Sequence, residues 1–182
     1  MITIMRAVLT LVLLGLALAA CDGREQAAEA PPPREYSGDA IGYFCNMLLA
    51  EHGGPKGQVH LRSRKTPLWF SSVRDTGAFT LLEGEAKDVT AIYVNDMGEA
   101  TDWAKPEPGT WVEAGAAWYV IGSRRLGGMG LPEVVPFGTR DGAEGFATDN
   151  GGRVVRLAEI PADYVLGTPQ MPTQEGEAHA TH

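Results

Sequence analysis

Two sulfur-bearing side chains, Cys45 and Met47, are separated by a single residue near the start of the region that can fold. A thiolate and a thioether are soft ligands, which Cu(I) prefers to oxygen donors. In an extended segment the two side chains share a face, whereas on a helix they diverge. The pair therefore predicts a soft-metal site, with one Cu(I) per chain. The alternative is that both residues belong to the core, beside Phe44, Leu48 and Leu49.

Cys45 is expected to be the only thiol of the mature chain, because Cys21 stands in the pattern of a bacterial lipoprotein signal. Segment 7–20 is apolar and ends in small residues, after which the cysteine sulfur would be alkylated with lipid. At about 14 residues it is shorter than the ~20 that a spanning helix needs, which disfavours a transmembrane anchor. We expect a periplasm-facing lipoprotein on the inner or the outer membrane. A lone thiol there is either a buried bystander or a functional group.

Three further places carry side chains that could complete a metal site. Met129 lies in the glycine-rich turn 124–130, where the backbone could approach a ligand closely; the alternative is a plain loop whose methionine plugs the core. His60 lies on an expected strand and could add an imidazole, although a lone strand histidine is more often structural. Asp96 and Met97 follow another expected strand, where functional residues often gather. A hydrogen-bonding turn explains these two residues equally well.

Charge and missing motifs narrow the function classes. The chain carries a net charge of −8 and has no basic block, so nucleic acid is not expected as a partner. The sequence contains no Gly-x-Ser-x-Gly, Cys-x-x-Cys or His-Glu-x-x-His motif and no visible acid–base pair. We therefore expect a protein that is not an enzyme. A thiol-dependent enzyme that uses Cys45 is the remaining catalytic alternative.

Composition divides the chain into segments. Those at both ends lack the apolar periodicity of a core, and the proline-containing N-terminal segment suits a spacer. The middle of the chain has enough apolar residues for a core. The expected segments are a lipoprotein signal peptide (1–20), a flexible tether (21–40), two folded units (41–98 and 99–166) and a flexible tail (167–182).

The two folded units show the same order of expected elements, which is strand, strand, helix and strand. In both 70–79 and 137–146 an aromatic strand end precedes Arg-Asp, and a glycine and a phenylalanine follow. Asp75 and Asp141 suit helix N-caps. The prediction is an α+β fold of two homologous ββαβ units in tandem, with chance similarity as the alternative. The expected strands are 58–64, 67–72, 89–95, 111–123, 133–139 and 153–160, and the expected helices are 73–85 and 141–149.

At these residues the chain resembles the NosL family, lipoprotein accessory factors of nitrous oxide reductase. The resemblance covers roughly 41–165 and the lipoprotein signal. It implies two homologous ββαβ units and delivery of Cu(I) to the copper–sulfide catalytic centre of the apo-reductase, from a copper donor that the sequence does not identify. It rests on the order and spacing of five motifs, at 44–47, 91–96, 117–123, 128–130 and 137–154.

The chain departs from the family pattern at two places. Many relatives have Cys-x-x-Cys-Gly-Met where this chain has Gly42, Cys45, Asn46 and Met47, so no second thiol is available at this point. Relatives often show Pro-Met-Gly where this chain has Gly-Met-Gly around Met129. The resemblance therefore implies copper ligation by Cys45 and Met47, to which Met129 can be added.

A membrane-tethered Cu(I) chaperone is the predicted function. The alternative is a metal-free assembly scaffold that binds the reductase, and uptake of one Cu(I) by the soluble domain separates the two. The family fold is also similar to that of organomercurial lyases. Those enzymes use cysteine thiols, and one thiol is a poor match to their chemistry.

Overall fold

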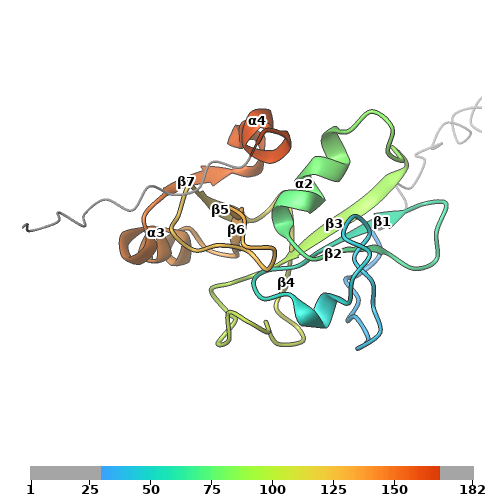
Figure 1. The fold of residues 1–182 in the computed structure, drawn as a ribbon, viewed down its shortest axis with the longest axis horizontal. Coiled ribbons are helices and arrows are strands. Elements are labelled where there is room, and N and C mark those ends of the chain that lie inside the picture. The colour runs from blue at the N-terminus through green and yellow to red at the C-terminus, as the bar shows by residue number, and fades with distance from the viewer. Residues whose placement is uncertain (1–29, 169–182) are drawn as a thin grey trace, which may run out of the picture. The chain divides into compact units, whose positions relative to one another are not determined.

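The computed structural model describes residues 30–168, and two sheets form the framework of that part of the chain (Figure 1). The strand orders are β2-β1-β3-β4 and β6-β5-β7, and all strand pairings are antiparallel. The first sheet comprises β1 (Gly57–Leu61), β2 (Leu68–Phe70), β3 (Val89–Asn95) and β4 (Trp111–Glu113), and the second comprises β5 (Trp118–Ile121), β6 (Val135–Phe137) and β7 (Arg153–Arg156). The helical segments are η1 (Leu49–Glu51), α2 (Val73–Leu81), α3 (Arg140–Asn150), η2 (Leu157–Glu159) and α4 (Ala162–Leu166).

The predicted tandem repeat is confirmed by the arrangement of the strands. In each half the first strand is central, the second strand lies on one side of it and the third lies on the other. A helix connects the second strand to the third, α2 in the first half and α3 in the second. Each helix packs against the strands of its own half. The fold is therefore α+β, with two ββαβ units in sequence.

The expected strand over 111–123 is wrong in one respect, because the structure divides this segment into β4 and β5. β4 pairs with β3 and extends the first sheet, although it follows the expected unit boundary at residue 98. A turn then carries the chain to β5, the central strand of the second sheet. The buried Tyr119 hydroxyl of β5 donates to the Ala114 carbonyl of this turn at 2.7 Å. The segment therefore joins the two sheets.

Hydroxyl side chains cap the helices of both units. Ser72 precedes α2, and its Oγ accepts a hydrogen bond from the Asp75 N–H at 3.0 Å. Thr139 precedes α3, and its Oγ1 accepts from the Gly142 N–H at 3.2 Å. The prediction that Asp75 and Asp141 are the caps is therefore wrong. Both aspartates lie in the first helical turn, where a carboxylate still faces the positive end of the helix dipole.

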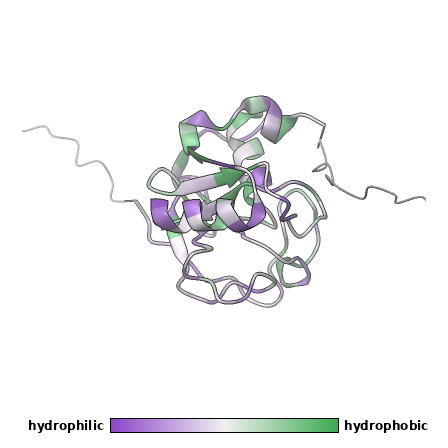
Figure 2. Cartoon of the chain, turned by 90° about the vertical axis from the view of Figure 1, so that its left-hand side faces the viewer, coloured by the Kyte–Doolittle hydropathy of each residue, from purple (hydrophilic) through white to green (hydrophobic). Residues whose placement is uncertain are grey.

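Apolar side chains fill the space between the sheets and the helices. Figure 2 looks at the end of the molecule that carries α3 and shows hydrophobic strands behind helices with hydrophilic outer turns. Aromatic and branched aliphatic residues dominate this interior. Prominent buried members are Val59, Phe70, Phe79 and Val94 in the first half and Tyr119, Val120, Val135 and Phe137 in the second.

Residues 31–36, here called the strap, are bonded to side chains of the first sheet. The Arg34 N–H donates to Gln58 Oε1 at 2.9 Å, and Gln58 Nε2 donates back to the Arg34 carbonyl at 3.0 Å. The Tyr93 hydroxyl donates to the Pro31 carbonyl at 2.7 Å. The expected tether is thus packed from residue 31 onward, and a flexible tether stays a prediction only for the residues before it.

Cys21, the expected signal peptide and residues 169–182 of the expected tail lie outside the described residues. Within 30–168, no helix is both long enough and apolar enough to cross a bilayer.

Candidate metal site

Cys45 lies in a tight loop, residues 42–47, whose ends are bonded to each other. The Gly42 N–H donates to the Met47 carbonyl and the Asn46 N–H donates to the Gly42 carbonyl, both at 2.9 Å. Asn46 has φ of 54°, a left-handed conformation that glycine and asparagine tolerate better than other residues. A glycine, which the family resemblance expects at this position, would fit for the same reason. The loop is a turn, neither strand nor helix, and its two hydrogen bonds fix the backbone at Cys45.

Aromatic packing fixes this loop against the first half of the protein. The Phe44 ring lies 5.4 Å from the Phe70 ring and 6.5 Å from the Phe79 ring, centroid to centroid. On the other side of the loop, the Ser71 hydroxyl donates to Cys45 Sγ at 3.5 Å. A hydroxyl donor of this kind suits a sulfur that carries negative charge. The Cys45 side chain is therefore oriented by its surroundings.

Met129 is presented by a second closed loop, which follows β5. The Gly127 N–H donates to the Leu131 carbonyl and the Gly130 N–H donates to the Gly127 carbonyl, both at 2.9 Å. Gly130 has φ of 70°, which glycine adopts without strain. The Met129 side chain is 42% exposed. The loop thus places a thioether at the surface.

Cys45 and Met129 line the same cavity, which has a volume of about 240 Å³. Cys45 lies before β1 in the first half, whereas Met129 lies between two strands of the second half, so the cavity requires both halves. Cys45 is half-buried and Met129 is exposed, so the cavity opens to solvent. A thiol and a thioether together are donors that a soft metal prefers. The other lining residues are Phe44, Ser72, Arg74, Asp75, Gly127, Leu131, Pro132 and Glu133.

Met47 shares a loop with Cys45 but is not among the residues that line the cavity. Its side chain is 38% exposed. Within 30–168, no three His, Cys, Asp or Glu side chains gather into a metal-binding group. The thioether donors that could join Cys45 are Met129, which lines the same cavity, and Met47, which shares its loop.

His60 does not line the cavity and makes the contacts of a structural histidine. It lies on β1 and is 6% exposed. Its Nε2 lies 2.8 Å from Gln58 Oε1, and its ring meets the Tyr93 ring edge-on at 5.7 Å between centroids. Burial, with a smaller contribution from the charge of Arg34, lowers the pKa of His60. The neutral imidazole thus packs beside the side chain that binds the strap.

Asp96 and Met97 lie where the two halves meet, outside the cavity lining. Asp96 Oδ1 accepts from the Gly98 N–H at 2.8 Å and closes a local turn. The Met97 N–H donates to the Pro136 carbonyl at 2.9 Å, and its side chain packs on the cluster around Phe137. These contacts agree with the alternative that the sequence left open, in which Asp96 and Met97 belong to a hydrogen-bonding turn.

Gly42 lies directly beside the thiol of Cys45. A Cβ built on Gly42 would be 2.5 Å from Cys45 Sγ, so the thiol occupies the space that a side chain would need. The family resemblance expects a cysteine at this position in many relatives. In this chain the absence of a side chain at Gly42 leaves the space to Cys45.

Sequence reasoning did not single out Glu133, a fully buried carboxyl group in the cavity wall. Its Oε1 accepts from the N–H groups of Arg74 and Val134, at 3.0 and 2.8 Å, whereas its Oε2 has no hydrogen-bond partner among the described residues. Burial raises the pKa of Glu133 to about 8. Burial likewise lowers the pKa of Lys56 to about 8, and its Nζ donates to the Gly54 carbonyl at 2.6 Å. The sequence signal that could have identified Glu133 is its position as a single carboxylate within the apolar run 131–137.

The fold and the cavity together define a class of protein: a small α+β protein of two tandem ββαβ units, with a thiol and a thioether from different halves in one solvent-open cavity. The chain belongs to the NosL family, whose sequence model matches residues 33–165.

Relatives of this chain are similar to it along most of their length. The copper-binding lipoprotein NosL of Achromobacter cycloclastes is 43% identical over 166 residues, which cover 89% of this chain and 85% of that protein. The protein of the same name from Stutzerimonas stutzeri is 30% identical over 168 residues, covering 92% and 85%. The crystal structure of the copper chaperone NosL from Shewanella denitrificans, 33% identical, superposes with a TM-score of 0.66 and covers 72% of this chain and 98% of that one.

Proposed function

We propose that this protein binds one Cu(I) per chain and carries it as cargo, without acting as an enzyme. The observation that supports this most directly is the shared cavity of Cys45 and Met129. The names of the relatives, which are called copper-binding lipoproteins and a copper chaperone, support the same choice of metal.

In this proposal Cys45 is the principal ligand, because a thiolate is the strongest soft donor in the cavity. Met129 supplies a neutral thioether from the opposite half, and Met47 is the candidate for a third ligand. Binding requires the Cys45 proton to leave, and the Ser71 hydroxyl is placed to donate to the resulting thiolate. Because Met129 and Met47 are both exposed, an acceptor can replace one sulfur ligand at a time.

We further propose that the copper is delivered to the copper–sulfide centre of apo nitrous oxide reductase in the periplasm. Lipid on Cys21 would attach the protein to a membrane. The strap begins at Pro31, so nine residues (22–30) separate Cys21 from the packed chain. Fully extended, the chain from Cys21 to Pro31 spans at most about 36 Å. The proposed anchor therefore keeps the cavity close to the membrane surface while the acceptor diffuses to it.

The test of the metal site is anaerobic Cu(I) titration of the soluble domain against a chromogenic competitor. Wild type is expected to take up one Cu(I), and Cys45→Ala is expected to lose this uptake because only the weaker thioether donors of Met129 and Met47 remain. Met47→Ala shows in the same assay whether the third sulfur takes part. Copper binding that is unchanged in Cys45→Ala, with Met47→Ala also unchanged, would contradict the assignment.

The test of delivery is nitrous oxide reduction and reductase copper content in cells that carry the Cys45→Ala or Cys21→Ala variant. In Cys45→Ala cells with normal levels of the protein, we expect loss of both nitrous oxide reduction and reductase copper. If the wild-type protein takes up no Cu(I) but its deletion still leaves the reductase immature, the metal-free scaffold is the correct function.

A further inference from the structure

The Met129 loop packs without spare room against Glu133. A Cβ built on Gly127 would overlap Glu133 Oε2, so the loop backbone lies directly on the buried carboxyl group. Through Oε1, the same carboxyl group accepts the N–H of Arg74 at the start of α2. Glu133 therefore contacts the Met129 loop with one oxygen and the first half of the protein with the other.

The next residue of the loop, Gly128, packs directly against the first half of the protein. A Cβ on Gly128 would lie 2.5 Å from the Gly53 carbonyl oxygen and 2.6 Å from His52 Cβ. His52 Nδ1 is 3.4 Å from the Gly128 carbonyl. Two successive glycines thus allow the loop to lie between Glu133 on one side and the backbone at 52–53 on the other. A loop with this packing has little freedom to move Met129 relative to the first half.

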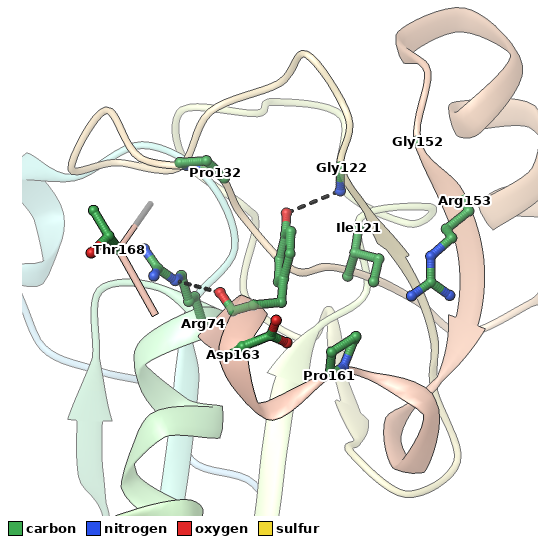
Figure 3. Close-up of a pocket in the computed structure, with 10 residues that line it drawn as sticks. Arg74, Ile121, Gly122, Pro132, Gly152, Arg153, Pro161, Asp163 and Thr168 are labelled. Atoms are coloured by element: carbon green, nitrogen blue, oxygen red, sulfur yellow. Dashed lines mark hydrogen bonds between the residues drawn. The ribbon is translucent and has the colours of Figure 1, made fainter. Parts of the chain in front are cut away.

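Arg74 extends this arrangement away from the metal cavity. Its guanidinium Nε and Nη2 donate to the carbonyls of Tyr164 and Gly167 at 3.1 and 2.7 Å. The Tyr164 hydroxyl accepts from the Gly122 N–H, at 3.0 Å, at the end of β5 (Figure 3). Arg74 lines both the cavity of Cys45 and a second cavity of about 470 Å³ around Tyr164. The residue that Glu133 binds is therefore itself fixed by α4.

We propose that Glu133 is a positioning residue of the copper site and that, with Gly127 and Gly128, it fixes Met129 opposite Cys45. This inference rests on the proposed function. Cys45 is oriented by its own loop, whereas Met129 reaches the same cavity only if the second half holds its loop in register with the first. Residues that orient a ligand in this way typically contribute about 10–100-fold to metal affinity.

The experiment compares Gly127→Ala and Glu133→Leu with wild type. Gly127→Ala pushes the loop off the carboxyl group, and Glu133→Leu removes the acceptor of the Arg74 N–H at similar volume. Each variant is measured by anaerobic Cu(I) competition and by X-ray absorption at the copper edge, which counts sulfur ligands. Both variants are expected to lose one sulfur ligand and ~10–100-fold in Cu(I) affinity. Glu133→Gln keeps an oxygen acceptor and should retain the wild-type sulfur count.

Two controls separate positioning from general loss of stability. Gly145→Ala makes the same chemical change on α3, where a Cβ would meet nothing within 4 Å, and should leave copper binding unchanged. Asn95→Ala removes a buried amide that accepts from the Lys56 N–H, so it should lower stability without changing the sulfur count.

A readout without copper keeps this inference separate from the proposed function. In metal-free protein, the ε-methyl NMR signal of Met129 is expected to shift in Gly127→Ala, whereas that of Met97 stays in place. If wild type takes up no Cu(I), the proposed function fails, and the methyl signal still tests the positioning. If both test variants keep the wild-type sulfur count and affinity, or if the Met129 methyl signal does not move, the role of Glu133 is overturned.

Discussion

At the scale of single residues, the site depends on two sulfurs that reach one cavity from distant points of the chain. Cys45 is set by the turn 42–47 and by the aromatic packing of Phe44, whereas Met129 is set by a glycine-rich loop of the other half. Cu(I) gains most from thiolate and thioether donors in a partly desolvated site. In the proposed copper site the two residues would therefore contribute unequally, with the charged thiolate first and the neutral thioether second.

Met129→Leu keeps the size and apolar character of the side chain and removes only its sulfur. We expect Cu(I) affinity, measured by anaerobic competition, to fall while stability changes little, because Met129 is 42% exposed. Met97→Leu is the matched control, since Met97 packs on a core cluster outside the cavity. Equal copper affinities in the two variants would show that the Met129 sulfur is not a ligand.

Residue chemistry drew attention to two of the residues that line the cavity. Cys45 and Met129 were recognisable because soft donors are few in the sequence and stand in distinctive contexts. Glu133 was not recognisable, because what distinguishes it is complete burial and a contact with Arg74, 59 positions away along the chain. The position of His60 was not predictable for a related reason, because a histidine on a strand looks the same in sequence whether it faces a cavity or, as here, a buried Gln58.

At the scale of elements, the protein uses one ββαβ plan twice, and the sequence revealed the plan better than its details. The expected strand 89–95 agrees with β3, because this long β-branched run has a clear pattern. The turn that separates β4 from β5 was missed because apolar residues continue through it. The helix N-caps were predicted to be aspartates, whereas the structure places the hydroxyl residues Ser72 and Thr139 at the N-cap positions.

The caps give a direct test at this scale. Ser72→Ala and Thr139→Ala each remove the acceptor of one first-turn N–H, and each is expected to lower the free energy of unfolding by about 0.5–2 kcal/mol. Asp141→Ala, which leaves the Thr139 hydroxyl in place, should cost less. Urea denaturation followed by far-ultraviolet circular dichroism measures all three. A larger loss in Asp141→Ala than in Thr139→Ala would restore the aspartate as the cap.

At the scale of the described part of the chain, buried polar groups join the two halves, and the strap is bonded to the first. Glu133, on the second half, accepts the Arg74 N–H of α2, and Arg74 in turn binds the carbonyl of Gly167. On the first sheet the fully buried Gln58 exchanges two hydrogen bonds with Arg34 of the strap. Such groups stabilise the fold only while their partners stay in place.

Glu133 gives stability a pH dependence of defined sign. Burial raises its pKa from 4.5 to about 8, so between these values the folded state keeps a proton that the unfolded state has lost. The free energy of unfolding should therefore fall as pH rises from about 5 to 8. Urea denaturation of metal-free protein across this range should show a fall on the order of 1–4 kcal/mol that Glu133→Gln lacks. Parallel pH profiles for wild type and Glu133→Gln would contradict the assignment.

The strap makes the last prediction, which concerns how far the folded part of the chain extends toward its N-terminus. A protein that begins at Ser37 lacks the Arg34 partner of Gln58 and leaves the Nε2 donor of this buried amide without its acceptor. It also loses the Glu35 carboxylate that accepts from Trp111 Nε1 at 3.2 Å. We expect its free energy of unfolding to be about 1–3 kcal/mol below that of a protein that begins at Ala30, because an unpaired buried polar group costs this much.

Urea denaturation followed by tryptophan fluorescence compares the two shortened proteins, and Trp111 reports on the strap directly. Gln58→Leu is the matched variant, since it removes the buried amide and should make stability less sensitive to the strap. If the proteins that begin at Ala30 and Ser37 unfold at the same urea concentration, the strap contributes no stability. The expected flexible tether would then extend to the start of the first folded unit, and the cavity could move farther from the membrane than residues 22–30 allow.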